Sequence, residues 1–100
     1  MTEITVLELR QRLAQGDHLF LLDVRQPEEH AESHIDGAVL IPLSELPERF
    51  EELSQEQEIV VFCRSGNRSA RAVAFLMAQG FSKVSNLVGG NNAWQAQAPH

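Results

Sequence analysis

The sequence predicts an α/β fold in which helices cover both faces of a parallel sheet. Short apolar segments alternate with helix-forming segments along the chain, which is the order expected of strands joined by crossover helices. These segments are apolar throughout, a pattern typical of strands that are buried on both faces. The 100 residues contain no internal repeat, linker or low-complexity segment, so we expect residues 1–100 to form a single domain.

The amino-terminal part begins with a predicted helix. Thr5 and Glu8 have the spacing of a capping box, and the apolar residues around them recur at helical spacing until Gly16, which can end a helix. Residues 19–24 form a continuous apolar run and predict a buried strand. Residues 27–32 predict a short helix that starts at a proline.

The middle of the chain predicts two more strands with a helix between them. The first strand spans 38–41, and Ser44 is expected to cap the helix that follows. The apolar face of this helix comprises Leu46, Phe50 and Leu53. Residues 58–62 are the strongest strand candidate, because they are apolar and rich in β-branched residues.

The last third predicts a helix at 69–79, a strand at 84–88 and a short helix at 90–97. Gly80 is placed to close the first of these helices. A stripe of mostly small residues is expected to pack that helix on the sheet. Its members are Ala70, Val73, Ala74 and Met77.

The charge balance narrows the choice of partners. The chain carries 14 acidic and 8 basic residues, for a net charge of −6. This opposes binding to phosphate backbones and anionic lipid, so we expect neither a nucleic acid nor a membrane as partner. Half of the basic residues nevertheless fall in one short stretch, which suits a small anion. They are Arg64, Arg68, Arg71 and Lys83.

The lone cysteine limits the redox and metal chemistry. One cysteine cannot form an intramolecular disulfide, and the four scattered histidines leave no metal-ligand spacing. We therefore expect no metal and no cofactor. The start of the chain lacks a signal-peptide pattern, and no run of apolar residues reaches the length of a membrane span. A reducing cytoplasm is the expected location.

Parallel α/β sheets place their sites at the carboxyl ends of the strands. In this sequence the rule selects three places: Asp23 with Arg25, the loop after Phe62, and the Gly89-Gly90 pair. The loop carries the most chemistry. Its residues are Cys63, Arg64, Ser65, Gly66, Asn67, Arg68 and Ser69.

A cysteine between a buried strand and a helix has a specific physical meaning. The backbone N–H groups of the loop and the helix N-terminus present positive charge to one point, and two arginines add to it. A free thiol titrates near pH 8.5, and this setting is expected to lower the pKa of Cys63. The alternative is an inert cysteine buried in the core. The glycine and arginines that follow Cys63 favour the reactive interpretation.

Four motifs together resemble a rhodanese-like domain over nearly the whole chain. The first two are residues 22–25 and the segment from His34 to Pro42. The others are the loop at 63–69 and Gly89-Gly90 with Ala93 and Trp94. The order and spacing of all four make the resemblance specific.

The resemblance implies both a fold and an activity. It implies a five-stranded parallel sheet, with the loop cradling a persulfide on the catalytic Cys63. It also implies transfer of sulfane sulfur from thiosulfate or a related small anionic donor to cyanide or a thiol, with a protein as a further candidate acceptor. A persulfide carrier with slow turnover of its own is an alternative, because we expect a single domain and therefore no second one to bind an acceptor.

Loop length bears on a third hypothesis, a cysteine-dependent phosphatase or arsenate reductase. Those relatives have five residues between cysteine and arginine, whereas four separate Cys63 from Arg68. One residue adds at most about 3.5 Å of chain. The shorter loop is therefore expected to form a narrower cradle, which suits a sulfur atom better than a phosphate.

The remaining site residues are expected to support the loop. Arg68 is expected to point inward to bind the donor, whereas the orientation of Arg64 stays open; either could instead pair with a carboxylate. Asp23 and Arg25 are expected to brace the cysteine loop.

Gly66 is expected to adopt a positive φ, with Ser65 and Asn67 shaping the turn and donating hydrogen bonds. Ser69 is expected to cap the following helix. His34 is expected to be a buried hydrogen-bonding residue, and three further histidines to be exposed: His18, His30 and His100. Polar Asn91 and Asn92 follow the glycine pair where the family often has an apolar residue, which is expected to alter the rim of the site.

Overall fold

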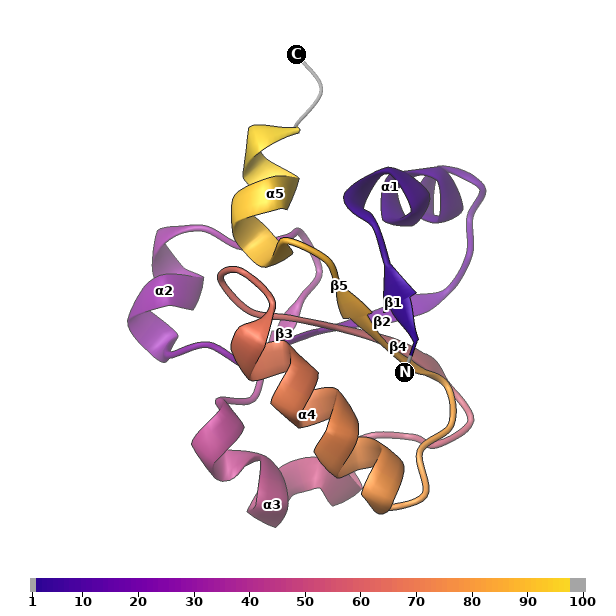
Figure 1. Ribbon diagram of the computed structural model, residues 1–100, viewed down its shortest axis with the longest axis vertical. Helices are drawn as coiled ribbons and strands as arrows, with labels where there is room; N and C mark the ends of the chain where they lie inside the picture. Colours follow the sequence, from indigo (N-terminus) through magenta and orange to yellow (C-terminus); the bar gives the residue numbers. More distant parts are fainter. Residues whose placement is uncertain (1, 98–100) are drawn as a thin grey trace.

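The computed structural model describes residues 2–97 and contains a five-stranded sheet with the order β1-β5-β4-β2-β3 (Figure 1). All neighbouring strands are parallel. The α/β prediction is therefore confirmed. The strands are β1 (Glu3–Ile4), β2 (Leu19–Asp23), β3 (Val39–Leu40), β4 (Glu58–Phe62) and β5 (Val84–Leu87).

Helices cover both faces of this sheet. In Figure 1, α1 and α5 lie on one side of the strands, and α3 and α4 lie on the other. Two short 3₁₀ helices flank α3. The elements are α1 (Val6–Ala14), α2 (Pro27–Glu32), η1 (Leu43–Glu45), α3 (Leu46–Arg49), η2 (Phe50–Glu52), α4 (Asn67–Ala78) and α5 (Gly90–Ala96). Among the residues from 2 to 97, no helix has the length and apolar character needed to span a membrane.

Each face of the sheet has its own apolar core. On the α3 and α4 side, Leu22, Val61 and Leu76 are fully buried. On the α1 and α5 side, Leu9 and Phe62 are fully buried. Burial of the central strands on both sides agrees with their apolar sequence, and it fixes the strand ends that carry the site.

Local signals place the first helix and the short helix α2 as expected. Glu8 N–H donates to Thr5 Oγ1 at 3.1 Å, and Thr5 N–H donates to Glu8 Oε1 at 2.9 Å, which completes the capping box. Pro27 opens α2, where its missing N–H costs nothing. β1 was not predicted from the pattern, because two residues are too few to show a strand's periodicity.

Two predictions around the edge strand β3 are wrong. Val39 is 44% exposed, so this strand is not buried on both faces; it lies at the edge of the sheet, beside β2 only. Ser44 does not cap a helix, because η1 already begins at Leu43. Pro47 has no N–H to donate to the Leu43 carbonyl, which instead accepts the Leu46 N–H in a 3₁₀ turn.

The helix after the cysteine loop starts two residues earlier than predicted. Gly66 precedes it with φ +119°, and α4 begins at Asn67, so Ser69 lies inside the first turn and is not the cap. The predicted stripe is also shifted, since Ala74 and Met77 are exposed. The buried side of α4 comprises Ser69, Ala72, Val73 and Leu76.

Candidate active site

The three places expected to carry chemistry lie at the carboxyl ends of neighbouring strands. Cys63 follows β4, Asp23 ends β2, and Gly89-Gly90 follows β5. β4 lies between β2 and β5 in the sheet, so the cysteine loop has one of the other two places on each side. Proximity of the three segments was predicted from parallel topology alone.

The thiol of Cys63 lies among hydrogen-bond donors of its own loop. Gly66 N–H donates to Cys63 Sγ at 3.0 Å, and the Ser69 hydroxyl lies 3.3 Å from the same sulfur. Gly66 can present its N–H in this way because glycine tolerates the positive φ. Cys63 is only 1% exposed, so these donors act on it in a region of low dielectric.

These contacts shift the thiol toward its ionised form. Burial acts to raise the pKa of Cys63, but hydrogen bonds from the Ser69 side chain and from the N–H groups of Ser69, Gly66 and Ser65 outweigh it. The net result is a pKa below the usual value for a thiol. The sequence predicted a lowered pKa for Cys63, and the structure agrees. The groups that lower this pKa are the Ser69 hydroxyl and the backbone N–H groups of the loop.

The glycine pair allows α5 to hold the loop from the other side. Asn91 N–H donates to the Cys63 carbonyl at 2.8 Å, and Asn92 N–H donates to the Arg64 carbonyl at 3.1 Å. A Cβ on Gly90 would lie 2.4 Å from the Cys63 carbonyl oxygen. Gly90 therefore permits a close approach between the start of α5 and the cysteine loop, which no larger residue allows.

The two loop arginines have different surroundings, and Arg68 does not take its favoured orientation. Arg68 was expected to point inward to bind the donor, but the structure shows the alternative, a bidentate ion pair with Glu29 of α2, at 2.8 and 2.9 Å. This pair lowers the pKa of Glu29 to about 2. Arg64, whose orientation was open, lines a cavity beside the loop and has no ion pair with any residue between 2 and 97.

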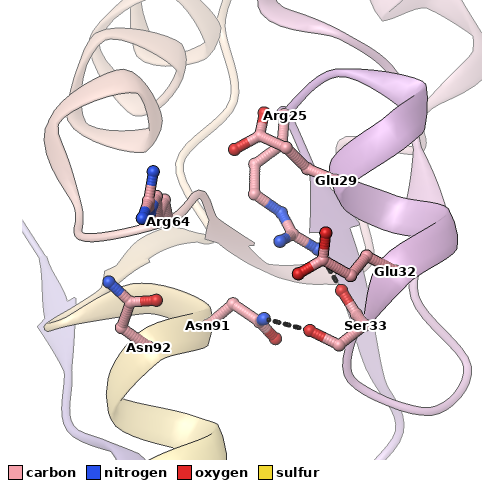
Figure 2. A pocket seen from close by; sticks show the side chains of 7 residues that line it. All are labelled: Arg25, Glu29, Glu32, Ser33, Arg64, Asn91 and Asn92. Atoms are coloured by element: carbon pink, nitrogen blue, oxygen red, sulfur yellow. Dashed lines mark hydrogen bonds between the residues drawn. The ribbon is translucent and has the colours of Figure 1, made fainter.

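The cavity lies between α2, the cysteine loop and the start of α5, and has a volume of about 240 Å³. Figure 2 shows Arg64 on one side of it and Glu32 on the other. Polar and charged residues form its lining, so it suits a small hydrophilic molecule. They are Arg25, Glu29, Glu32, Ser33, Arg64, Asn91 and Asn92.

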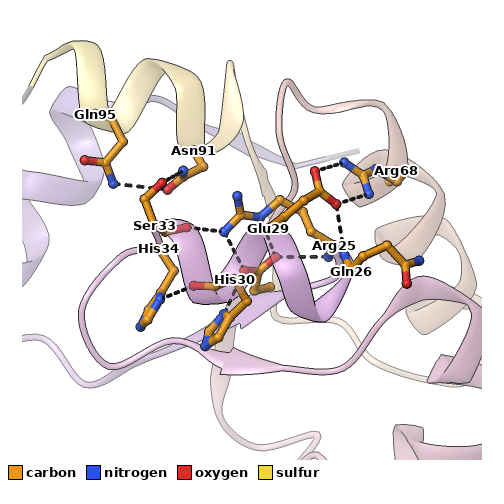
Figure 3. A network of polar contacts seen from close by, with 10 residues as sticks. Arg25, Gln26, Glu29, His30, Ser33, His34, Arg68, Asn91 and Gln95 are labelled. Carbon is orange, nitrogen blue, oxygen red and sulfur yellow. Dashed lines mark hydrogen bonds and ion pairs between the residues drawn. The ribbon is translucent and has the colours of Figure 1, made fainter.

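Asp23 and Arg25 form a buried pair that holds α2. Arg25 Nε–H and Nη2–H donate to the Asp23 carboxylate at 2.9 and 2.8 Å, and Arg25 also donates to the Ser33 carbonyl (Figure 3). No hydrogen bond joins this pair to the described cysteine loop, so the expected brace is not a direct contact. The connection instead runs through α2, whose Glu29 holds Arg68.

His30 joins the same network. Its Nδ1 lies 2.9 Å from Asp23 Oδ2, and its ring stacks on His34 with 3.8 Å between ring centroids. Burial acts to raise the pKa of Asp23, yet the hydrogen bonds from Arg25 and His30 lower it overall.

The four histidines divide into different environments. His30 was expected to be exposed, which is wrong, since it is half-buried against Asp23. His34 forms its expected hydrogen bond, 2.7 Å to the His30 carbonyl, but is only half-buried. His18 is exposed as expected, and His100 lies outside the described residues.

Asn86 was missed by sequence reasoning and lies beside the loop. It is 5% exposed in the middle of β5. Its side chain contacts both the Ser69 hydroxyl and the Gly66 carbonyl. The available signal was an asparagine within a predicted strand, because an amide that is buried there needs hydrogen-bond partners.

Two further observations concern the position of Lys83 and the arrangement of potential metal ligands. Lys83 lies just before β5, at the opposite end of the sheet from the loop, and donates to the Glu56 carbonyl. The basic cluster of the sequence is therefore not one surface patch. Across residues 2–97, no group of three or more potential metal ligands comes together.

The fold and the loop define an α/β protein with a buried cysteine of lowered pKa at the end of its central strand. The rhodanese-like domain family model matches residues 5–97. A sulfurtransferase from Allochromatium vinosum is 42% identical over 94 residues, which cover 94% of this chain and 88% of that protein. The putative sulfur carrier protein YrkF of Bacillus subtilis is 41% identical over 92% of this chain and 50% of its own length.

Solved structures agree with these relatives. A rhodanese-related protein from Thermoplasma volcanium superposes with a TM-score of 0.90 at 31% identity, covering 100% of this chain and 96% of that one. The chain belongs to the rhodanese-like domain family. The names of its relatives support sulfur transfer as the general activity.

Proposed function

We propose that the protein moves sulfane sulfur from thiosulfate or a related anionic donor to cyanide or a thiol through a persulfide on Cys63. The observation that carries the proposal is the set of loop donors around Cys63 Sγ, with Gly66 N–H at 3.0 Å. Such donors favour a thiolate, which can attack sulfur without a general base. A reducing compartment such as the cytoplasm would keep this thiol free.

The proposed reaction has two displacements. The thiolate attacks the outer sulfur of the donor, so that an S–S bond to Cys63 forms while the donor's own S–S bond breaks. With thiosulfate, sulfite leaves with the electron pair. An acceptor then attacks the outer sulfur of the persulfide, and the electron pair of the broken bond returns to Cys63 Sγ as a thiolate.

The cavity beside the loop is the proposed binding place for the donor. Arg64 supplies a cation there that forms no ion pair with a described residue, and the Glu32 carboxylate lies on the opposite side of the cavity. Asn91 and Asn92 supply amides. Arg25 also lines the cavity, but its charge is already matched by Asp23. Because Cys63 is 1% exposed, side chains around it have to shift before a donor reaches Sγ.

A steady-state assay tests the enzyme proposal. Purified protein with thiosulfate and cyanide is expected to form thiocyanate and sulfite in equal amounts, and Cys63→Ala is expected to form neither. Product formation by Cys63→Ala at the wild-type rate would contradict the assignment of Cys63. In a separate assay with an aryl phosphate as substrate, we expect no burst of product, because only four residues separate Cys63 from Arg68.

A persulfide carrier is the second candidate. It is favoured by the similarity to a protein named as a putative sulfur carrier and by a site in which Cys63 is almost fully buried. A carrier would accept one sulfur from a donor yet release it slowly to cyanide. Rapid release to a partner protein, with little turnover on free cyanide, would favour the carrier over the enzyme.

A further inference from the structure

The Ser69 hydroxyl lies between two acceptors and has one proton to donate. Its oxygen is 3.3 Å from Cys63 Sγ and 2.5 Å from Asn86 Oδ1. A hydroxyl donates one hydrogen bond at a time, so the two acceptors compete for it. Ser69 is fully buried and Asn86 is 5% exposed, so solvent has little access to either contact.

The orientation of the Asn86 amide is fixed by its other contact. Its Nδ2–H donates to the Gly66 carbonyl at 3.2 Å. A carbonyl can only accept, so a flipped amide would place two oxygens against each other. The Asn86 backbone is also held, because it lies in β5 in register with Glu3 of β1 and Val61 of β4. Oδ1 therefore stays directed at Ser69.

We propose that Asn86 is a positioning residue that competes with the Cys63 thiolate for the Ser69 proton and so sets how strongly that thiolate is stabilised. When Ser69 donates to Asn86, the sulfur keeps the loop N–H groups but loses one hydrogen bond. A thiolate with fewer hydrogen bonds is more basic and more nucleophilic. Asn86 thus tunes the reactivity of Cys63 without touching it.

The favoured acceptor of the Ser69 hydrogen bond is expected to change during turnover, an inference that rests on the proposed function. In the persulfide the negative charge lies on the outer sulfur, and Cys63 Sγ becomes a weak acceptor. The Ser69 hydroxyl therefore donates its hydrogen bond to Asn86 Oδ1. When the outer sulfur leaves, the charge returns to Sγ and the proton turns toward it. Ser69 then stabilises the departing thiolate at the moment its charge develops.

The test is a double-mutant cycle read out by the pKa of Cys63, measured from the pH dependence of its alkylation rate. Asn86→Leu frees the Ser69 proton for Sγ and is expected to lower this pKa by about one unit, the size of a hydrogen bond to a charged group. Ser69→Ala is expected to raise it. In the Ser69→Ala background, Asn86→Leu is expected to have much less effect.

The cycle separates positioning from a purely structural role. Asn86→Leu also removes the hydrogen bond to the Gly66 carbonyl, but that loss occurs in both backgrounds. An equal shift in both backgrounds, no shift, or a higher pKa in Asn86→Leu would overturn the proposal. Alkylation needs no sulfur donor, so this result is independent of whether the protein turns over thiosulfate.

Nuclear magnetic resonance of the unmodified protein provides a second measurement if the leucine variant does not fold. The side-chain amide signals of Asn86 are expected to shift with pH at the pKa of Cys63, because the Ser69 proton moves between the two acceptors. Ser69→Ala is expected to abolish most of this shift. The proposal would be overturned if the Asn86 amide signals did not shift at the pKa of Cys63, or if they shifted equally in Ser69→Ala.

Discussion

At the residue scale, the two arginines of the cysteine loop have different surroundings. Both terminal guanidinium nitrogens of Arg68 donate to the Glu29 carboxylate, so the charge of Arg68 is paired and joins the loop to α2. Arg64 lines the cavity and has no carboxylate partner between residues 2 and 97. An anion that enters the cavity therefore meets Arg64 as the cation with an unmatched charge.

Replacement of Arg64 is expected to weaken donor binding. For Arg64→Ala we predict a KM for thiosulfate about ten-fold higher, equivalent to about 1.4 kcal/mol, with a smaller change in kcat. Arg71→Ala is the matched control, because Arg71 is exposed on α4, outside the cavity, and its loss changes the net charge equally. Equal effects of the two substitutions would show that overall charge, and not the position of Arg64, attracts the donor.

The roles of single residues were the hardest part to predict. The position of Cys63 among the donors of its loop and the positive φ of Gly66 could be predicted from the sequence, because a glycine-containing loop follows the cysteine. The partners of Arg68 and Asp23 could not, because Glu29 and His30 come from α2, and their positions depend on packing and not on local pattern. Asn86 was missed for the same reason.

At the element scale, the site depends on how closely α5 approaches the cysteine loop. The N–H groups of Asn91 and Asn92 satisfy carbonyls of Cys63 and Arg64. Gly90 sits at this contact with φ +58°. The helix thus fixes the loop backbone from outside while Gly66 and Ser69 contact the sulfur from within.

A methyl group at Gly90 is expected to disrupt this contact. In Gly90→Ala the new Cβ would lie 2.4 Å from the Cys63 carbonyl oxygen, so the loop or α5 must move. We predict a loss of stability of about 3 kcal/mol or more and a sulfur-transfer rate at least about ten-fold lower. Urea unfolding and the thiocyanate assay measure the two effects.

Gly37→Ala is the control for backbone strain alone. Gly37 also has a positive φ, +86°, but no atom lies within 4 Å of its added Cβ. Its expected cost is about 1–2 kcal/mol, with sulfur transfer unchanged. If both alanine variants lost the same stability and the same activity, the steric account of Gly90 would be wrong.

Elements with a complete local signal were predicted well. The capping box places α1, and the continuous apolar runs place β2 and β4. The predicted buried side of α4 was wrong because the helix begins at Asn67, and the side chain of Ser69 turns toward the sheet instead of capping. Short elements such as β1 form only when a neighbouring strand is present, which a local pattern does not show.

At the scale of the whole molecule, two ion pairs connect segments that are distant in sequence. Arg68 of α4 holds Glu29 of α2, and Arg12 of α1 holds Glu58 of β4, with one contact at 2.7 Å. The first pair joins the cysteine loop to the wall of the cavity, so it links the stability of the fold to the geometry of the site.

The Glu29 pair is expected to make stability depend on pH in the acid range. Arg68 lowers the pKa of Glu29 from 4.5 to about 2. The stabilisation from the pair is therefore present above pH 4.5 and is lost as the pH falls toward 2. We predict that Arg68→Met costs about 1 kcal/mol at pH 7, since the pair is partly exposed. The difference from wild type should shrink as the pH drops through this window.

Urea unfolding at several pH values between 7 and about 2 measures this effect. Arg71→Met serves as the control, because Arg71 has no ion pair with a described residue, and its small effect should not change with pH. A constant difference between Arg68→Met and wild type across the range would contradict the assignment of the Glu29 pKa to Arg68.

Mass spectrometry of the intact protein after incubation with thiosulfate detects the proposed persulfide on Cys63 itself. We expect the wild-type chain to gain the mass of one sulfur atom, cyanide to remove it, and Cys63→Ala to gain none. No added sulfur on the wild-type chain, or the same addition to Cys63→Ala, would contradict a persulfide on Cys63 and with it the proposed sulfur transfer.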